Sequence, residues 1–215
     1  VTSLIGSTGS GKSTVVNLIP RFFEVSKGSI RIDGVDIREL SQYDLREQIG
    51  FVPQKGLLFS GTIDSNMRIG KPDADEAAVR DAIETAQAAD FVFGKPEGLE
   101  AEVAQGGTNF SGGQKQRLSI ARALVKKPPI YIFDDSFSAL DFKTDATLRQ
   151  ALKKNVGNST VLIVTQRVAT AISSDQILVL DNGRLIGQGT HQELLKSCQT
   201  YQEIASSQLS KEELA

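Results

Sequence analysis

The segment GSTGSGKST, residues 6–14, constrains the fold of this chain more than any other feature. It satisfies the pattern G-x-x-x-x-G-K-[ST] and lies between an apolar run, residues 1–5, and an amphipathic run, residues 12–22. This pattern forms a phosphate-binding loop when a strand precedes it and a helix follows it. Its glycines let backbone N–H groups surround phosphate oxygens, and the helix start adds a favourable dipole. The chain is therefore predicted to bind a nucleoside triphosphate.

Individual residues of this loop have distinct expected roles. Lys12 would reach the β- and γ-phosphates, and the Ser13 hydroxyl would be a ligand of Mg²⁺. Asp134 ends the apolar run IYIF, where a carboxylate would hold Mg²⁺ directly or through water. The predicted nucleotide-binding residues of the loop are Gly6, Ser7, Thr8, Gly9, Ser10, Gly11, Lys12, Ser13 and Thr14.

Composition excludes several other classes of protein. The chain has 215 residues, of which 40% are hydrophobic and 23% charged, as is typical of a globular protein. A formal net charge of −2 does not favour a nucleic-acid or membrane-surface binder. One cysteine, Cys198, allows no intrachain disulfide and is typical of a reducing compartment. The chain begins inside a strand pattern, so we expect it to be part of a longer protein.

Short apolar runs separated by helical patterns predict an α/β fold with a mainly parallel, buried sheet. The expected strands are residues 1–5, 28–34, 49–53, 129–134, 160–165 and 176–181, followed by a final strand and a helix start within 184–194. Residues 12–22 and 74–93 predict helices, and one face of the second carries Ala78, Val79, Ala82, Ile83 and Ala86.

Residues 54–125 show helical and loop patterns but no convincing strand. We therefore expect residues 1–53 and 126–203 to form an ATP-binding core, into which residues 54–125 are inserted as a helical subdomain. Residues 204–215 are polar and are predicted to form a C-terminal tail.

A second helix start also has anion-binding character. Ser111, Gly112, Gly113 and Gln114 open an amphipathic helix whose apolar face carries Leu118, Ala121 and Leu124 or Val125. Such a start offers backbone N–H groups and a hydroxyl to an anion. Two phosphate-binding helix starts in one small chain predict either two nucleotides or one nucleotide shared between two chains.

The order and spacing of these motifs resemble the nucleotide-binding domain of an ABC transporter, over nearly the whole chain. The motifs are GSTGSGKST, FVPQ, FSGGQ, IYIFDD and SALD, and LFSGTIDSNMRIG further resembles a segment of exporter-type members. The resemblance implies a P-loop NTPase (RecA-like) core with an inserted α-helical signature subdomain, and ATP with Mg²⁺ as cofactors. It implies a second nucleotide-binding domain as partner and a transmembrane domain, fused N-terminally, at the cytoplasmic face of the cell membrane. The family's adenine-stacking aromatic lies further upstream, which implies that the N-terminal part of the domain is missing.

The resemblance also implies roles for particular residues. Gln54 would contact Mg²⁺ or the attacking water. Ser111, Gly112, Gly113 and Gln114 would contact the nucleotide bound to the partner domain. Residues 138–141 would form the D-loop at the dimer interface, and Glu102 would lie where exporters contact their transmembrane domain.

The sequence departs from the family at two catalytic positions. Asp135 stands where the family has Glu, and its carboxylate retreats by about 1.5 Å, whereas a general base must lie within about 3.2 Å of its proton. Gln166 replaces the family's histidine and cannot carry a proton. Ser111 and Gly113 remain intact as the catalytic contribution to a partner's site. The chain thus resembles the degenerate-site half of a heterodimeric, multidrug-type exporter.

Two alternatives remain open. One is a homodimeric exporter with slow, symmetric hydrolysis, in which Asp135 acts through an extra water. The other is a soluble ABC ATPase that acts on nucleic acid, although residues 54–111 show neither heptads nor a Lys/Arg cluster. The only histidine, His191, is predicted to be structural: Thr190 and Glu193 fit a capping box, with His191 as the first residue of a surface helix.

Overall fold

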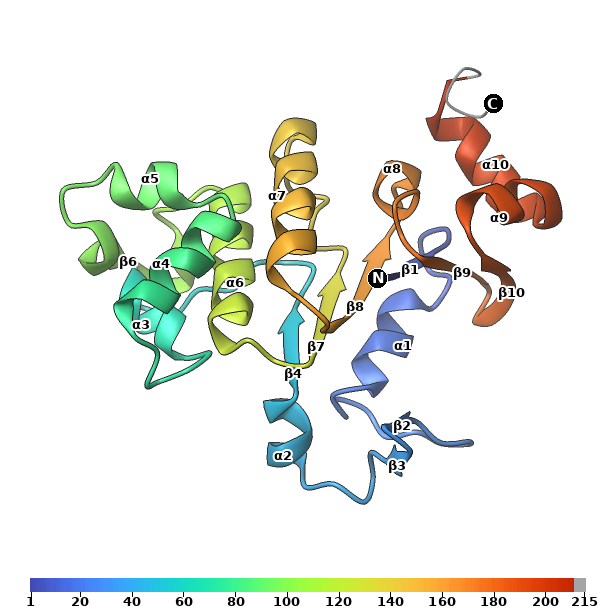
Figure 1. Cartoon of the computed structure of the whole chain (residues 1–215), viewed down its shortest axis with the longest axis horizontal. Helices are drawn as coiled ribbons and strands as arrows, with labels where there is room; N and C mark the ends of the chain where they lie inside the picture. Colours follow the sequence, from blue (N-terminus) through green and yellow to red (C-terminus); the bar gives the residue numbers. More distant parts are fainter. Residues whose placement is uncertain (211–215) are drawn as a thin grey trace. The chain divides into compact units, whose positions relative to one another are not determined.

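The computed structural model describes residues 1–210, which form two compact units (Figure 1). The first unit comprises residues 1–49, 132–135 and the described residues from Thr160 onward. The second comprises residues 50–131 and 136–159. The chain passes between the units within two strands, β4 (Ile49–Val52) and β7 (Ile130–Asp134).

The first unit is built on a mainly parallel sheet, as the sequence predicts. Its strands are ordered β10-β9-β1-β8-β7, with bounds Thr2–Ile5 for β1, Thr160–Thr165 for β8, Gln176–Asp181 for β9 and Arg184–Gly189 for β10. Strand β1 pairs in parallel with both β8 and β9. Strand β10 is antiparallel to β9, because Asn182 and Gly183 both have positive φ and form the tight turn that closes a hairpin.

Helices complete the first unit. They are α1 (Lys12–Leu18), α2 (Gln42–Glu47), α8 (Val168–Ala171), α9 (His191–Ser197) and α10 (Gln199–Gln208). The side chains of Ile5, Ile177 and Tyr201 lie in one fully buried cluster, so β1, β9 and α10 share a core. Cys198 is free and belongs to the same cluster. The site described below therefore rests on a packed core.

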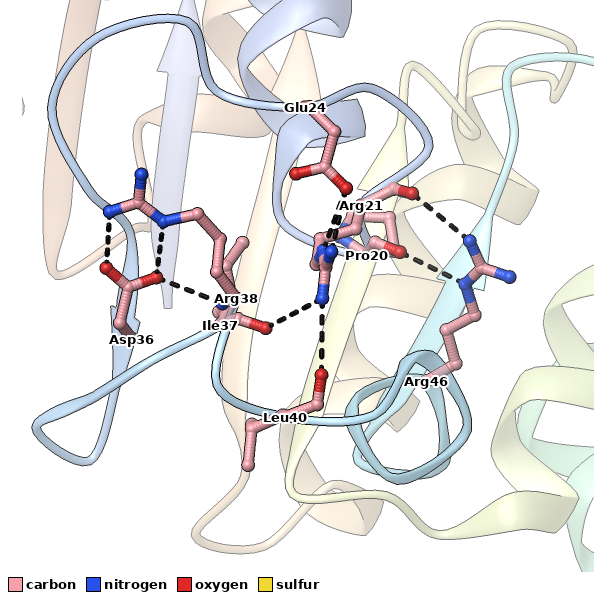
Figure 2. A network of polar contacts seen from close by, with 8 residues as sticks. All are labelled: Pro20, Arg21, Glu24, Asp36, Ile37, Arg38, Leu40 and Arg46. Carbon is pink, nitrogen blue, oxygen red and sulfur yellow. Dashed lines mark hydrogen bonds and ion pairs between the residues drawn. The ribbon is translucent and has the colours of Figure 1, made fainter.

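The segment between α1 and α2 contains less strand than predicted. Residues 28–34 contribute only β2 (Arg31–Ile32), which pairs with β3 (Val35–Asp36). Guanidinium groups hold this segment instead (Figure 2): the Arg21 Nη1 donates to the carbonyls of Ile37 and Leu40, and the Arg46 Nε donates to the Pro20 carbonyl. These backbone carbonyls are thus paired with charged side chains rather than with a neighbouring strand.

The second unit contains the helical subdomain. Its elements are β5 (Gly61–Thr62), α3 (Ile63–Arg68), α4 (Glu76–Thr85), α5 (Ala89–Phe93), β6 (Glu102–Val103), α6 (Gly112–Lys126) and α7 (Phe142–Asn155), with short 3-10 turns at Gly98–Glu100 and Gln105–Gly107. Strands β5 and β6 pair with each other over two residues each. The expectation of no strand in residues 54–125 was therefore wrong at this one short pairing. Residues 136–159, with α7, belong to this unit, whereas the sequence placed them in the core.

Residues 74–93 form two helices rather than the single helix predicted. The chain turns at Gln87, which has a positive φ of 56°, and α5 starts two residues later. Most of the predicted apolar face is correct, since Val79, Ala82, Ile83 and Ala86 are buried, whereas Ala78 is half-buried. The pattern thus identified the buried face but carried no signal for the break.

One expectation for the C-terminal region needs correction. Residues 204–208 belong to α10, and Ala205 is fully buried, so the predicted polar tail does not begin at 204; residues 211–215 lie outside the described part. His191 opens α9 after a Thr190–Glu193 capping box, as expected, and its side chain is buried against the Tyr201 hydroxyl. Within residues 1–210, no helix combines the length and apolar character needed to cross a membrane.

Candidate nucleotide-binding site

The phosphate-binding loop occupies residues 6–11, between the end of β1 and the start of α1. A Cβ on Gly6 would lie 2.1 Å from the Leu180 carbonyl oxygen, so only glycine fits where the chain leaves the sheet. Gly11 has a φ of 99°, which other residues rarely adopt, and it occupies the N-cap of α1. These glycines turn the loop back over the end of the strand and lead it into the helix.

Lys12 places its ammonium group inside this loop. Its Nζ donates to the carbonyls of Gly6 (2.9 Å) and Ser7 (2.7 Å) and to the Ser10 hydroxyl (3.2 Å). Burial lowers the pKa of Lys12, while the negative charges of Asp135 and Asp134 act in the opposite direction. The loop therefore surrounds a positive charge at the place where the sequence predicts the phosphates.

Ser13 and Asp134 lie together, as predicted for a metal site. The Ser13 hydroxyl donates to the Asp134 Oδ1 at 2.9 Å. Burial raises the pKa of the Asp134 carboxyl, and the hydrogen bond from Ser13 opposes that rise. A hydroxyl and a buried carboxylate are hard oxygen donors that suit Mg²⁺, which completes its shell with water and substrate phosphates. Within residues 1–210, no group of three or more His, Cys, Asp or Glu side chains is placed to hold a metal ion. Ser13 and Asp134 thus fit Mg²⁺.

Asp135 has a backbone conformation that the sequence did not reveal. Its φ is 47°, in the left-handed region, and its N–H donates to the Val164 carbonyl at 3.0 Å. Asp is one of the few residues other than glycine that adopt this region readily. Its carboxylate lies near enough to Lys12 to raise the pKa of that ammonium. The structure thus brings Asp135 to the loop, in a conformation that favours Asp itself.

Gln166 lies against the phosphate-binding loop. It follows β8, and its Oε1 accepts a hydrogen bond from the Thr8 hydroxyl at 3.1 Å. Its backbone carbonyl accepts from the Gln208 Nε2 at 2.8 Å. Gln166 and Thr8 were predicted as site residues, whereas Gln208 was expected to lie in a tail; no sequence motif marks that residue.

The signature residues belong to the second unit and form a reciprocal capping box. The Ser111 Oγ accepts from the Gln114 N–H at 3.2 Å, and the Gln114 Oε1 accepts from the Ser111 N–H at 3.0 Å. The N–H groups of Ser111 and Gln114 are therefore already paired with each other's side chains. Around a Cβ built on Gly112 there is open space, whereas one on Gly113 would lie 3.4 Å from the Ala139 carbonyl oxygen.

Three further predicted positions also lie in the second unit. Gln54 follows β4, and the preceding Pro53 carbonyl accepts from the Gln116 Nε2 at 3.0 Å, which fixes the loop to α6. Asp141, at the end of residues 138–141, is the N-cap of α7. Glu102 is exposed on β6. The structure gives each a defined local environment within that unit.

Comparisons with known proteins agree with this geometry. The sequence model of the family described as "ABC transporter" matches residues 1–138. An ABC transporter ATP-binding protein of Mycobacterium tuberculosis is 50% identical over 210 residues, which cover 96% of this chain and 36% of the relative. A Staphylococcus aureus protein, named for multidrug export as an ATP-binding/permease protein, is 42% identical over 206 residues, covering 96% of this chain and 36% of the relative.

The structure of a bacterial Atm1-family ABC exporter with ATP bound is similar in fold, with a TM-score of 0.93 and 40% sequence identity. The similarity covers 98% of this chain and 37% of that one. The chain therefore spans little more than a third of the length of these relatives. The family match covers more than half of the chain and includes the loop, Asp134 and the signature residues. This chain belongs to the ABC transporter family, as an ATP-binding domain homologous to those of ABC exporters.

Proposed function

We propose that this chain is the ATP-binding domain of an ABC exporter that dimerises around Mg-ATP to drive transport. A relative named for multidrug export and an exporter with ATP bound support this proposal, because both align with nearly the whole chain. The name ATP-binding/permease supports a transmembrane domain on the same polypeptide, at the cytoplasmic face of the membrane. The partner would be a second ABC nucleotide-binding domain, on a different chain.

Within the chain's own site, several residues would bind and orient the nucleotide. Lys12 would exchange its carbonyl contacts for phosphate oxygens, and the start of α1 would add N–H donors, because Gly11 has no side chain to cap that start. Ser13 and Asp134, which already share a hydrogen bond, would hold Mg²⁺. When bound, the metal would neutralise charge on the β- and γ-phosphates.

Hydrolysis at this site is proposed to be slow. The observation that carries the proposal is the hydrogen bond between Gln166 and Thr8, which supports an amide rather than a titratable ring beside the γ-phosphate. Gln166 can donate a hydrogen bond there but cannot exchange a proton. Asp135 has the short carboxylate, and a misplaced general base typically forfeits about 10²–10⁴ in rate. The site would therefore hold ATP longer than it hydrolyses it.

The signature residues would complete the partner's site. The Ser111 hydroxyl can donate to a phosphate oxygen while it still accepts from Gln114, because a hydroxyl offers both functions. The N–H of Gly113 and the dipole of α6 would stabilise the same developing charge. The chain would thus contribute more to hydrolysis in its partner's site than in its own.

The test is the ATPase activity of the reconstituted full transporter with Ser111→Ala or Asp135→Asn. Loss of one such donor typically costs roughly 2.7–4 kcal/mol, so Ser111→Ala should lower the rate by about 10²–10³-fold. Asp135→Asn should cost much less. Thr62→Ala is the matched control, since Thr62 caps α3 in a similar box but has no predicted phosphate. Equal damage by the Ser111 and Asp135 variants would contradict the proposal and indicate a homodimer with equivalent sites.

A further inference from the structure

We propose that Gln208, the last residue of α10, is a positioning residue that holds Gln166 against the phosphate-binding loop. The inference rests on the proposed function, in which Gln166 contacts the γ-phosphate. Gln208 lies 42 positions from Gln166 in the sequence, and both belong to the first unit.

The Gln208 amide spans the backbone on both sides of Arg167. Its Nε2 donates to the Gln166 carbonyl at 2.8 Å, and its Oε1 accepts from the Val168 N–H at 2.9 Å. A carboxamide offers a donor and an acceptor side by side, so both halves of the side chain are used. Neither an alkyl group nor a carboxylate of the same shape could make the two bonds together.

The segment after β8 needs such a partner. Helix α8 begins at Val168, and its N-cap, Arg167, provides no side-chain cap. The first N–H groups of a helix have no acceptor within the helix, so Gln208 supplies one from outside. The Thr165 hydroxyl accepts from the Arg167 N–H at 2.9 Å. Three hydrogen bonds to the backbone thus fix residues 166–168.

Helix α10, which carries Gln208, is anchored in the core of the first unit. Tyr201 and Ala205, on the same helix, are fully buried in the core cluster, and Leu209 packs against that cluster. Helix α10 contacts α8 (Figure 1). Gln208 itself is exposed, so its two bonds can be changed without opening the core. The side-chain amide of Gln208 therefore links α10 to the backbone of Gln166. The side chain of Gln166 in turn accepts a hydrogen bond from Thr8 in the loop.

The first readout is hydrogen exchange in the full transporter without nucleotide. Gln208→Ala should increase exchange in a peptide that contains residues 165–170, because the Val168 N–H loses its acceptor. Gln208→Glu should leave this peptide closer to the parent, since a carboxylate can still accept from the Val168 N–H, although it cannot donate to the Gln166 carbonyl. Gln202→Ala is the matched control: on the same helix, its Nε2 donates to the Leu195 carbonyl at 2.7 Å, away from this segment. Unchanged exchange in Gln208→Ala would overturn the inference.

The second readout is the ratio of ATP affinity to ADP affinity at this site. If Gln208 acts by placing Gln166 at the γ-phosphate, Gln208→Ala should lower this ratio by about threefold to tenfold, the value of one ordinary hydrogen bond. ADP affinity should not change, whereas a merely structural defect would weaken both nucleotides. The effect should also vanish when Gln166→Ala is already present.

The same measurements separate the inference from the proposed function. If Gln166→Ala leaves the ATP-to-ADP ratio unchanged, the proposed role of Gln166 fails, and the inference fails with it. If Gln166→Ala lowers the ratio but Gln208→Ala does not, the inference alone is overturned. If both variants lower the ratio and their effects do not add, Gln208 positions Gln166.

Discussion

Two helix starts in this chain carry the motifs for binding phosphate, yet they are built differently. Helix α1 starts at Gly11, whose lack of a side chain leaves the start without a side-chain cap. Helix α6 starts at Ser111, which forms a reciprocal capping box with Gln114. Both starts have the dipole and the N–H groups that favour an anion. They differ in whether a side chain already caps the helix start.

This difference indicates that the two helix starts have different roles toward a nucleotide. The loop before α1 is shaped by glycines and contains the Lys12 ammonium, so it is ready for a phosphate. At α6 the Gln114 N–H already has an acceptor, and a capping bond is typically worth about 1 kcal/mol. A phosphate can therefore add to this box, by accepting from the Ser111 hydroxyl, rather than replace it. The first start is suited to hold a nucleotide, and the second is suited to respond to one.

Lys12 gives the strongest test of whether the start of α1, rather than that of α6, holds the nucleotide. Lys12→Ala should weaken Mg-ATP binding to the chain by about 10²–10⁴-fold, because two charge-assisted hydrogen bonds to phosphate are each worth about 1.5–3 kcal/mol. Titration calorimetry would measure this. Lys115→Ala, which removes a lysine from α6, is the matched control and should leave binding by the single chain unchanged. Equal losses from both variants would mean that the two starts are not distinct.

The next largest effect is expected from repairing both catalytic departures in the full transporter. Asp135→Glu together with Gln166→His should raise hydrolysis at this site by about 10–10²-fold, part of the usual contribution of a well-placed base. This increase should exceed the sum of the increases in the two single variants, since residues of one catalytic unit are not additive. Asp135→Glu also puts a less suitable residue at a φ of 47°, so its thermal stability should be measured alongside. Independent effects of the two changes would contradict the coupling.

Local motifs made much of this molecule predictable. The G-x-x-x-x-G-K-[ST] pattern located the loop, and apolar runs located β1, β7, β8 and β9 within a few residues. Ser13 and Asp134 were each predicted as Mg²⁺ ligands, from the loop pattern and from the acid that ends an apolar run, and the structure joins them by a hydrogen bond. These features depend on residues close in sequence or on a well-known topology.

Contacts between distant residues were not predictable. The hydrogen bonds from Gln208 to the backbone beside Gln166 join segments about 40 positions apart and have no periodic signal. The left-handed conformation of Asp135 depends on where the chain leaves β7, which its residue type alone does not specify. The break at Gln87 between α4 and α5 likewise has no glycine or proline to mark it. Tertiary contacts decide such details.

The capping box itself can be tested by stability. In the nucleotide-free chain, Ser111→Ala should lower the free energy of unfolding by about 1 kcal/mol, whereas Ser111→Gly should cost only a few tenths. Thr14→Ala is the matched control on α1: Thr14 is exposed, and alanine has the higher helix propensity, so stability should hold or rise slightly. Urea unfolding followed by circular dichroism would measure all three. A Ser111→Ala chain as stable as the parent would show that the box at α6 contributes nothing.

A third helix start sharpens the comparison through its response to pH. Helix α9 has a capping box like that of α6, but its first residue is His191, the only histidine of the chain. The ring is buried, and its Nδ1 lies 2.8 Å from the Tyr201 hydroxyl. Burial lowers the pKa of His191 below its usual 6.5, so the folded chain favours the neutral ring.

The unfolded chain therefore binds a proton more readily than the folded chain. The stability due to the neutral ring is present above about pH 6.5 and is lost as the pH falls through the lowered pKa of His191. One proton changes the free energy of unfolding by at most about 1.4 kcal/mol per pH unit, so the loss between pH 6.5 and 5 should be modest. Urea unfolding at several pH values would measure it. In His191→Gln, which keeps a polar group for Tyr201 but does not titrate, stability should vary less over this range. A pH dependence identical to that of the parent would mean that the start of α9 is as insensitive to protons as those of α1 and α6.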